Sequence, residues 1–308
     1  MQFNIIGENI HIISPKVKAA VRDRNVKFFQ DLAVAQVEAG AVALDLNIGP
    51  QKKHGHEIMP WLVEIVQEVV DVPLSFDTMN LAAIEAGCKV ARVQPIINST
   101  SADPERLETV TPLAKKYNTK LVALTMGTGM IPVGADERVN IALETLIPKA
   151  LELEIPVEDL IIDPLSLTVV GCQEYAPECV EAVRMLKFAW DPPPAVSVGL
   201  SNTSNRVPHA LRPLINQTYL IMLMGAGLDT AIADPLDEGV VETIRIVEQR
   251  DESTALNQLK LRLFDATMEM DTLQPEDVDF DDPDQVAFWK TVQILRNDVI
   301  YTDSYLDL

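Results

Sequence analysis

The chain has 308 residues, of which 47% are hydrophobic, enough to fill the core of one large domain or two ordinary ones. Its formal net charge of −21 at pH 7 opposes nucleic acid as a ligand, because affinity for a phosphate backbone rests largely on Lys and Arg. The three cysteines lack metal-type spacing, and no apolar run is long enough to span a membrane. The N-terminus does not resemble a signal peptide, so we expect a cytoplasmic protein without a membrane segment.

Eight short apolar runs each stop at a polar side chain, and every gap between them can hold a helix. Short runs rich in Ile and Val are typical of strands buried on both faces, and their alternation with helices predicts a parallel sheet. The runs lie at residues 3–8, 43–47, 74–78, 94–99, 120–126, 160–163, 195–202 and 230–234. Eight such units predict an α/β fold, a (β/α)8 TIM barrel with its active site at the C-terminal strand ends.

Helix signals fill the gaps between these runs. Periodic apolar residues predict helices at 26–39, 59–70, 80–89, 177–190 and 212–227. Asp103 followed by Pro104 predicts an N-cap and the first position of another helix. A last barrel helix is expected at 235–249, with Asp234 as its N-cap.

Two segments look like ligand sites but are interpreted otherwise. His54 and His56 lie on a loop without a nearby third ligand, so we expect them to be solvated and expect no metal in this chain. Residues 126–136 are rich in glycine but lack the Lys and Ser/Thr of a phosphate-binding loop, and we interpret them as a lid over the barrel mouth.

The chain is predicted to divide into a barrel at 1–250 and an appendage at 251–308 that packs on it. In the appendage, residues 255–270 have the pattern of a helix. Phe288, Val292, Leu295 and Val299 fit the apolar face of a last helix. Between them, residues 274–285 are strongly acidic and are predicted to form a solvated loop.

The polar residues at the strand ends form one set: Glu8, Asp45, Asn47, Asp77, Asn98, Asp163, Asn202 and Asp234. The set contains acceptors and amides but no lysine, which excludes a Schiff-base aldolase. It suits a flat, neutral heterocycle with several N–H donors, such as a pterin along its 2-amino and N3–H edge. Each residue alone also fits a helix cap or a turn, but caps do not require the same end of eight strands.

The motifs GEN, LDLNIG, SFDT, INST, IIDPL and GLSN followed by RPLIN occur in this order between residues 3 and 248. This series resembles the pterin-binding barrel family, and specifically the methyltetrahydrofolate:corrinoid-protein methyltransferases. The resemblance implies that Asp77, Asn98 and Asp163 hold the pterin ring and that Asn202 hydrogen-bonds N5, the nitrogen that carries the methyl group. Arg212, in RPLIN, matches a family arginine only loosely. Asn9 and His11 stand where the family commonly has GERIN.

On this basis we predict Asn202, Asp77 and Asp163 as catalytic residues. The predicted folate-binding residues are these three together with Glu8, Asp45, Asn47, Asn98 and Arg212. The implied reaction moves a methyl group between N5 of tetrahydrofolate and the cobalt of a cobalamin carried by a partner corrinoid protein. Because a tertiary amine is a poor leaving group, N5 must be protonated or strongly hydrogen-bonded, and Asn202 would position and stabilise that N5–H.

The physiological direction stays open between the acetyl-CoA pathway and O-demethylation, and the longer C-terminal region slightly favours the second. Two alternatives compete with methyl transfer. A dihydropteroate synthase would need a Lys after the seventh strand and an Arg near the eighth, where this chain has GLSNTSN and IADPLDE. A non-catalytic folate-binding subunit would not need Asn202. We also expect a homodimer formed through the outer helices, which leaves the barrel mouth open.

Overall fold

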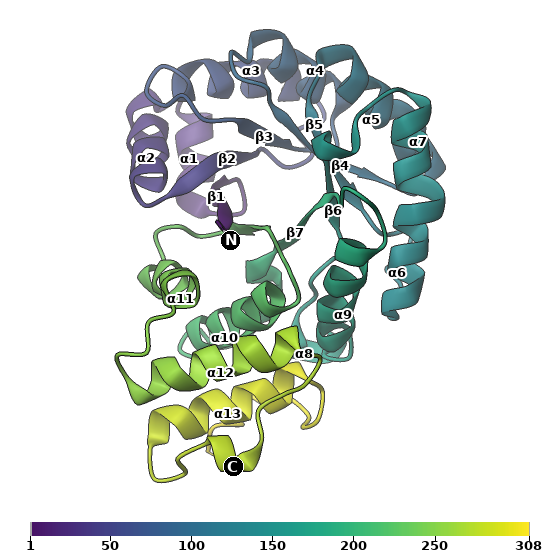
Figure 1. Cartoon of the computed structure of the whole chain (residues 1–308). Helices are drawn as coiled ribbons and strands as arrows, with labels where there is room; N and C mark the ends of the chain where they lie inside the picture. The colour runs from purple at the N-terminus through teal and green to yellow at the C-terminus, as the bar shows by residue number, and fades with distance from the viewer. Residues whose placement is uncertain (1, 308) are drawn as a thin grey trace.

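The computed structural model describes residues 2–307 (Figure 1). Eight parallel strands close into a barrel in sequence order, which confirms the predicted (β/α)8 fold. The strands are β1 (Asn4–His11), β2 (Ala41–Asn47), β3 (Leu74–Asp77), β4 (Ile96–Ser101), β5 (Lys120–Leu124), β6 (Leu160–Asp163), β7 (Ala195–Gly199) and β8 (Thr230–Ala233). Because all eight run the same way, their C-terminal ends meet at one rim.

Helices surround the barrel as an outer layer (Figure 1). Those of the barrel are α1 (Pro15–Arg22), α2 (Val26–Glu38), α3 (Gly55–Val66), α4 (Leu81–Val90), α5 (Pro104–Tyr117), α6 (Ala135–Ile141), α7 (Ile147–Glu152), α8 (Val169–Cys172), α9 (Tyr175–Phe188), α10 (Arg212–Gly225) and α11 (Glu238–Gln249). A π-helical turn, η1 (Ala142–Leu146), joins α6 to α7, and short 3-10 turns are η2 (Val157–Asp159) and η3 (Leu200–Ser204).

The hydrophobic core has two parts, as expected for a barrel. A small cluster inside the barrel consists of Ile6, Ala43, Ile96, Val122 and Ile161, from five different strands. The larger cluster lies between the strands and the surrounding helices. The inner cluster fills the barrel, so the only space for a ligand along its axis is above the C-terminal strand ends.

Several boundaries differ from the prediction. β1 continues past Glu8 to His11, with an irregular register against β2 between Gly7 and Ile10. β7 ends at Gly199, so Asn202 lies in the η3 turn rather than on the strand. α3 begins at Gly55, four residues earlier than predicted, and includes His56.

Two predicted roles are wrong. The N-cap of α11 is Asp237, whose carboxylate accepts hydrogen bonds from the backbone of Gly239 and Val240, whereas Asp234 lies before the helix. Val299 does not extend the apolar face of the last helix, because that helix ends at Leu295 and Val299 is half exposed.

The C-terminal segment packs beside α10 through α12 (Ala255–Met268) and α13 (Pro283–Leu295) (Figure 1). The acidic stretch between them contains a 3-10 turn, η4 (Pro275–Asp277), and leads into α13. α10 and α12 approach closely at Gly225, where a Cβ would lie 2.8 Å from the carbonyl oxygen of Phe264. Within residues 2–307, no helix combines the length and the apolar character needed to cross a membrane.

Candidate active site

A cavity of about 760 Å³ opens at the C-terminal rim of the barrel. The residues predicted to bind folate all line it: Glu8, Asp45, Asn47, Asp77, Asn98, Asp163, Asn202 and Arg212. Asp234 lines it too, together with Asn9 and His11 of the extended β1. The predicted set therefore forms one site, although it comes from residues that span more than 200 positions of the chain. No residue of the glycine-rich segment 126–136 is among the described residues that line this cavity, so the lid stays a prediction.

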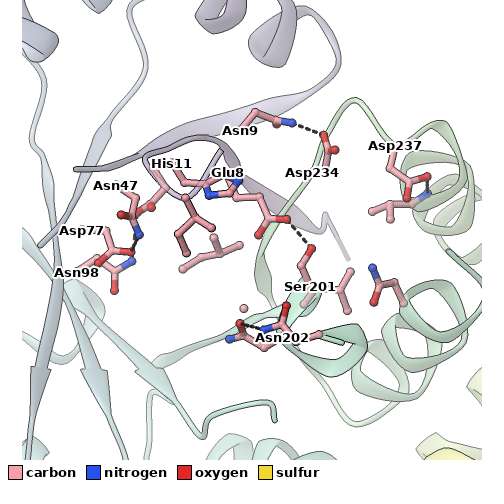
Figure 2. Close-up of a pocket in the computed structure, with 18 of the residues that line it drawn as sticks. Glu8, Asn9, His11, Asn47, Asp77, Asn98, Ser201, Asn202, Asp234 and Asp237 are labelled. Atoms are coloured by element: carbon pink, nitrogen blue, oxygen red, sulfur yellow. Dashed lines mark hydrogen bonds between the residues drawn. The ribbon is translucent and has the colours of Figure 1, made fainter. Parts of the chain in front are cut away.

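The ends of β2, β3 and β4 carry a linked cluster of carboxylates and amides. Oδ1 of Asp45 accepts hydrogen bonds from the Ser75 hydroxyl at 2.6 Å and from Nδ2 of Asn98 at 3.1 Å. Nδ2 of Asn47 donates to Oδ2 of Asp77 at 2.5 Å, and Figure 2 shows Asn47, Asp77 and Asn98 gathered on one side of the cavity. Each aspartate thus uses one carboxylate oxygen within this cluster, and the hydrogen bonds found among residues 2–307 leave the other oxygen unused.

The surroundings of this cluster disfavour negative charge. Burial, followed by the nearby Asp77 carboxylate, holds the pKa of Asp45 well above its usual range, and the bonds from Ser75 and Asn98 only partly oppose this. Burial also raises the pKa of Asp77 to about 6, against the stabilising effects of Asn47 and Arg106. A ligand that brings N–H donors would supply the missing stabilisation of the ionised forms.

Asp163, at the end of β6, is the most enclosed acceptor after Asp45. It is 6% exposed, and its Oδ1 accepts the backbone N–H of Leu165 at 2.7 Å. Burial raises the pKa of Asp163 to about 7, although the Leu165 bond and the Arg138 guanidinium lower it. The hydrogen bonds found within residues 2–307 leave its Oδ2 free.

The other side of the cavity is built by β1 and by the η3 turn after β7. Glu8 extends toward Ser201 (Figure 2), whose hydroxyl donates to Oε1 at 2.5 Å. Burial raises the pKa of Glu8 to about 7; the Ser201 bond and Arg212 lower it, and Asp234 adds to the increase. Arg212, at the start of α10, donates from Nε to the Ser204 hydroxyl at 3.2 Å.

Asn202 reaches the cavity because the chain turns sharply after β7. Gly199 permits this turn, since a Cβ at that position would lie 2.7 Å from Nδ2 of Asn202. The only side-chain bond found for Asn202 among the described residues is a long one, from Nδ2 of Asn205 to its Oδ1 at 3.4 Å. Its amide is therefore available to a ligand.

The sequence assigned no role to several residues of this site, although it marked Asn9 and His11 as departures from the family motif. Ser201 lies inside the GLSN motif and bonds Glu8, which only the structure shows. Nδ2 of Asn9 donates to Oδ1 of Asp234 at 2.8 Å and so holds that carboxylate at the rim (Figure 2). Burial lowers the pKa of His11, with Asp234 acting in the opposite sense. His209 also lines the cavity, and no periodic or motif signal marked it.

The cavity is rich in acceptors and poor in cations. Its lining has six acidic residues, Glu8, Asp45, Asp77, Asp163, Asp234 and Asp237, but only one arginine, Arg212, and no lysine among the residues described. Such a lining favours a ligand with N–H donors over a polyphosphate. Among residues 2–307, no group of three or more His, Cys, Asp or Glu side chains is placed to hold a metal ion.

The chain is similar to known proteins over most of its length. The family described as pterin binding enzymes matches residues 16–234. A methylcorrinoid:tetrahydrofolate methyltransferase of Eubacterium limosum is 28% identical over 246 residues, which cover 78% of this chain and 88% of that protein. A methionine synthase of Mycobacterium tuberculosis is also 28% identical over 238 residues, but these are 74% of this chain and only 20% of that much longer protein.

Solved structures share the fold at lower identity. A dihydropteroate synthase of Yersinia pestis superposes with a TM-score of 0.59 at 19% identity, covering 81% of this chain and 93% of its own. A dihydropteroate synthase of Xanthomonas albilineans, in complex with 7,8-dihydropteroate, gives a TM-score of 0.57 at 17% identity and covers 82% and 94% of the two chains. At these identities the likeness shows the common barrel and nothing about the reaction.

Proposed function

Because the chain belongs to the pterin binding enzyme family, we propose that it moves a methyl group between N5 of tetrahydrofolate and the cobalt of a corrinoid protein. The observation that carries this proposal is the position of Asn202, an amide that lines the cavity after β7 and forms only one long hydrogen bond among the described residues. The similarity to a methylcorrinoid:tetrahydrofolate methyltransferase over most of both chains supports the same reaction.

The carboxylates supply the recognition of the ring. Asp163 has one oxygen free, and Asp77 and Asn98 lie together on the far side of the cavity from the β7 turn. A pterin presents adjacent N–H donors at its 2-amino and N3 positions, so a carboxylate can accept both as it would from a guanidinium. With this edge held by Asp163 and the ring contacted by Asp77 and Asn98, N5 would point toward Asn202.

Chemistry at N5 then needs no nucleophile from this chain. Low-valent cobalt on the partner attacks the methyl carbon in line, the C–N5 bond breaks, and its electron pair stays on N5. The bond breaks readily only if N5 carries a proton, since otherwise the leaving nitrogen would become an anion. Asn202 is too weak an acid to supply this proton, but its carbonyl can accept and hold the resulting N5–H. In the reverse direction, unprotonated N5 attacks the methyl on cobalt.

Partners follow from this chemistry. The corrinoid is too large to enter the cavity, so a separate corrinoid protein must present it at the barrel mouth. We also propose a homodimer through those outer helices that the C-terminal segment leaves uncovered. Both the acetyl-CoA pathway and O-demethylation need such a step, and they differ in its direction.

Dihydropteroate synthase activity is the alternative that the test must distinguish, since proteins with that activity have the same fold. That reaction has an anionic leaving group, for which the cavity offers only Arg212 among its described lining residues. The segment after β8 carries the acidic residues Asp234, Asp237 and Glu238 where a cation would be needed.

The deciding experiment mixes the protein with methyltetrahydrofolate and chemically reduced cobalamin and follows the absorbance of methylcobalamin. Asn202→Ala is the test variant, and Asn140→Ala, at an exposed asparagine of α6, is the matched control. Methylcobalamin formation by wild type and control supports the proposal. No transfer, combined with condensation of a pterin pyrophosphate with p-aminobenzoate, would instead indicate a dihydropteroate synthase. Folate binding without either reaction would indicate a non-catalytic folate-binding subunit.

A further inference from the structure

Two arginines are buried beneath the rim of the cavity without an acidic partner in contact. Arg138 is fully buried and Arg106 is 9% exposed. Neither forms a salt bridge with any residue between 2 and 307, and every hydrogen bond found for the two guanidinium groups goes to a backbone carbonyl. Burying a positive charge in this way is costly unless a negative charge lies nearby.

Both arginines sit at the same place in a strand–helix unit. Arg106 is the third residue of α5, after β4, and Arg138 is the fourth residue of α6, after β5. A helix dipole disfavours a cation close to the helix N-terminus, so the position itself contributes nothing favourable. Side chains on a helix lean toward its N-terminus, which in a barrel faces the C-terminal strand ends. Both side chains therefore reach the rim from below.

The two guanidinium groups bind equivalent atoms. Arg106 donates to the carbonyl of Thr78, the residue directly after Asp77, at 3.1 Å. Arg138 donates to the carbonyl of Pro164, the residue directly after Asp163, at 3.0 Å.

Each arginine also fixes a second segment. Arg106 binds the carbonyl of Ser99 at 2.9 Å, next to Asn98, and so joins the ends of β3 and β4. Arg138 binds the carbonyls of Pro132 and Val133, both at 3.0 Å, and so joins the loop after β5 to the end of β6.

We propose that Arg106 and Arg138 are positioning residues that act through Asp77 and Asp163: each holds a positive charge against the backbone that follows one aspartate and favours the ionised form of that carboxylate as an acceptor for the pterin. This inference rests on the proposed function, because it assigns the two aspartates to pterin N–H donors. The arginines do not touch the ligand. Their electrostatic effect opposes that of burial, which favours the protonated form of both aspartates.

Other titratable groups near the two aspartates do not provide this effect. Asp163 faces Cys179 of α9 besides Arg138, and a thiol in that position cannot stabilise a carboxylate as a cation does. Asp77 faces Asp45 of β2, whose charge would oppose its own, and Asn47, which is neutral. The guanidinium is the stabilising charge in both cases.

The test compares Arg138→Met, which removes the charge at similar volume, with Arg138→Lys, which keeps it. Arg184→Met is the matched control, because the side chain of Arg184 of α9 is only 11% exposed but is paired with Glu181 and does not line the cavity. Calorimetry with methyltetrahydrofolate between pH 6 and pH 9 gives the affinity of each protein. We expect the pH below which binding is lost to rise by about one to two units in Arg138→Met and to stay at the wild-type value in Arg138→Lys and Arg184→Met. A loss of affinity that is equal at every pH, or an equal shift in Arg138→Lys, would overturn the proposal.

A second measurement decides the matter without any ligand and without the arginine variants. Asp45 and Asp163 are similarly buried, 4% and 6% exposed, but only Asp163 has an arginine behind it. Carbon-13 NMR of labelled aspartate carboxyls in ligand-free Asp77→Asn, which lacks the charge beside Asp45, should show Asp163 titrating at the lower pH. The reverse order would refute the role of Arg138. If the protein binds no folate, the proposed function fails, while this titration still reports on the arginine.

Discussion

Replacing Asn202 by alanine should separate catalysis from binding. In the protein without ligand, the Asn202 side chain forms one long hydrogen bond, accepted from Asn205 at 3.4 Å. Removing the Asn202 amide therefore leaves no strongly hydrogen-bonded group without its partner. We expect the free energy of unfolding to change by less than about 1 kcal/mol. Loss of one neutral hydrogen bond to the bound folate should weaken affinity by about 1 kcal/mol, or roughly fivefold.

The rate should fall much further if the amide stabilises protonated N5. A preorganised polar contact is strongest where charge changes, and its loss typically costs about 10²- to 10³-fold in rate. Stopped-flow traces of Co(I) consumption at saturating methyltetrahydrofolate give this rate directly, with Asn140→Ala as control. A variant that transfers the methyl at the wild-type rate and only binds more weakly would refute the catalytic role of Asn202.

Three further predictions concern binding, stability and assembly. Asp163→Asn should weaken methyltetrahydrofolate binding by about 2 kcal/mol, or roughly 30-fold, because the amide donates where a ligand N–H must be accepted; unchanged calorimetric affinity would remove Asp163 from the binding site. Because Asp163 binds in its ionised form and its pKa is about 7, wild-type affinity should be complete at pH 8.5 and fall about tenfold per unit below pH 7, and a flat profile down to pH 5.5 would contradict this. Gly225→Ala should destabilise the protein by about 1–3 kcal/mol in thermal unfolding, since its Cβ would lie 2.8 Å from the Phe264 carbonyl, and an unchanged melting temperature would argue against this close contact. Light scattering of this variant should still show a dimer that converts free cobalamin, and a monomer would argue against the proposed dimer.

The barrel could be predicted from the sequence because its signal is local and repeated. Each buried strand is a short apolar run that ends in a polar residue, and β6, predicted at 160–163, has those bounds in the structure. Asn80 and Asp103, which the sequence placed at the starts of two helices, accept backbone N–H groups as N-caps. Such features depend on a few neighbouring residues, so one sequence suffices to find them.

Features decided by tertiary contacts were beyond the sequence. The segment before α11 offers two aspartates that could cap it, and only the bond from Asn9 to Asp234 shows why the cap is Asp237. The apolar period of the last helix continues to Val299, but the chain leaves the helix at Leu295 and Asn297 adopts a left-handed conformation.

The buried arginines show the same limit more sharply. In the sequence, Arg106 and Arg138 are ordinary charged residues of two helices, where a solvated surface position is the usual expectation. Their burial becomes visible only when the loops after β3 and β6 fold back over them and present backbone carbonyls. A search for cations close to helix N-termini, where the dipole disfavours them, would have marked both positions for attention.

The proposed reaction places two opposite proton demands on one cavity. The aspartates that hold the pterin edge must be ionised, whereas N5 must carry a proton before the methyl leaves. Asp77 and Asp163 have an arginine close behind them, which favours the ionised form. Across the cavity, Glu8 lies beside the turn that carries Asn202, and burial raises its pKa to about 7, so Glu8 can carry a proton near neutral pH, as Asp163 can. As pH falls, the rate of transfer from bound methyltetrahydrofolate should therefore rise while its affinity declines, and the two effects can be measured separately in kcat and KM.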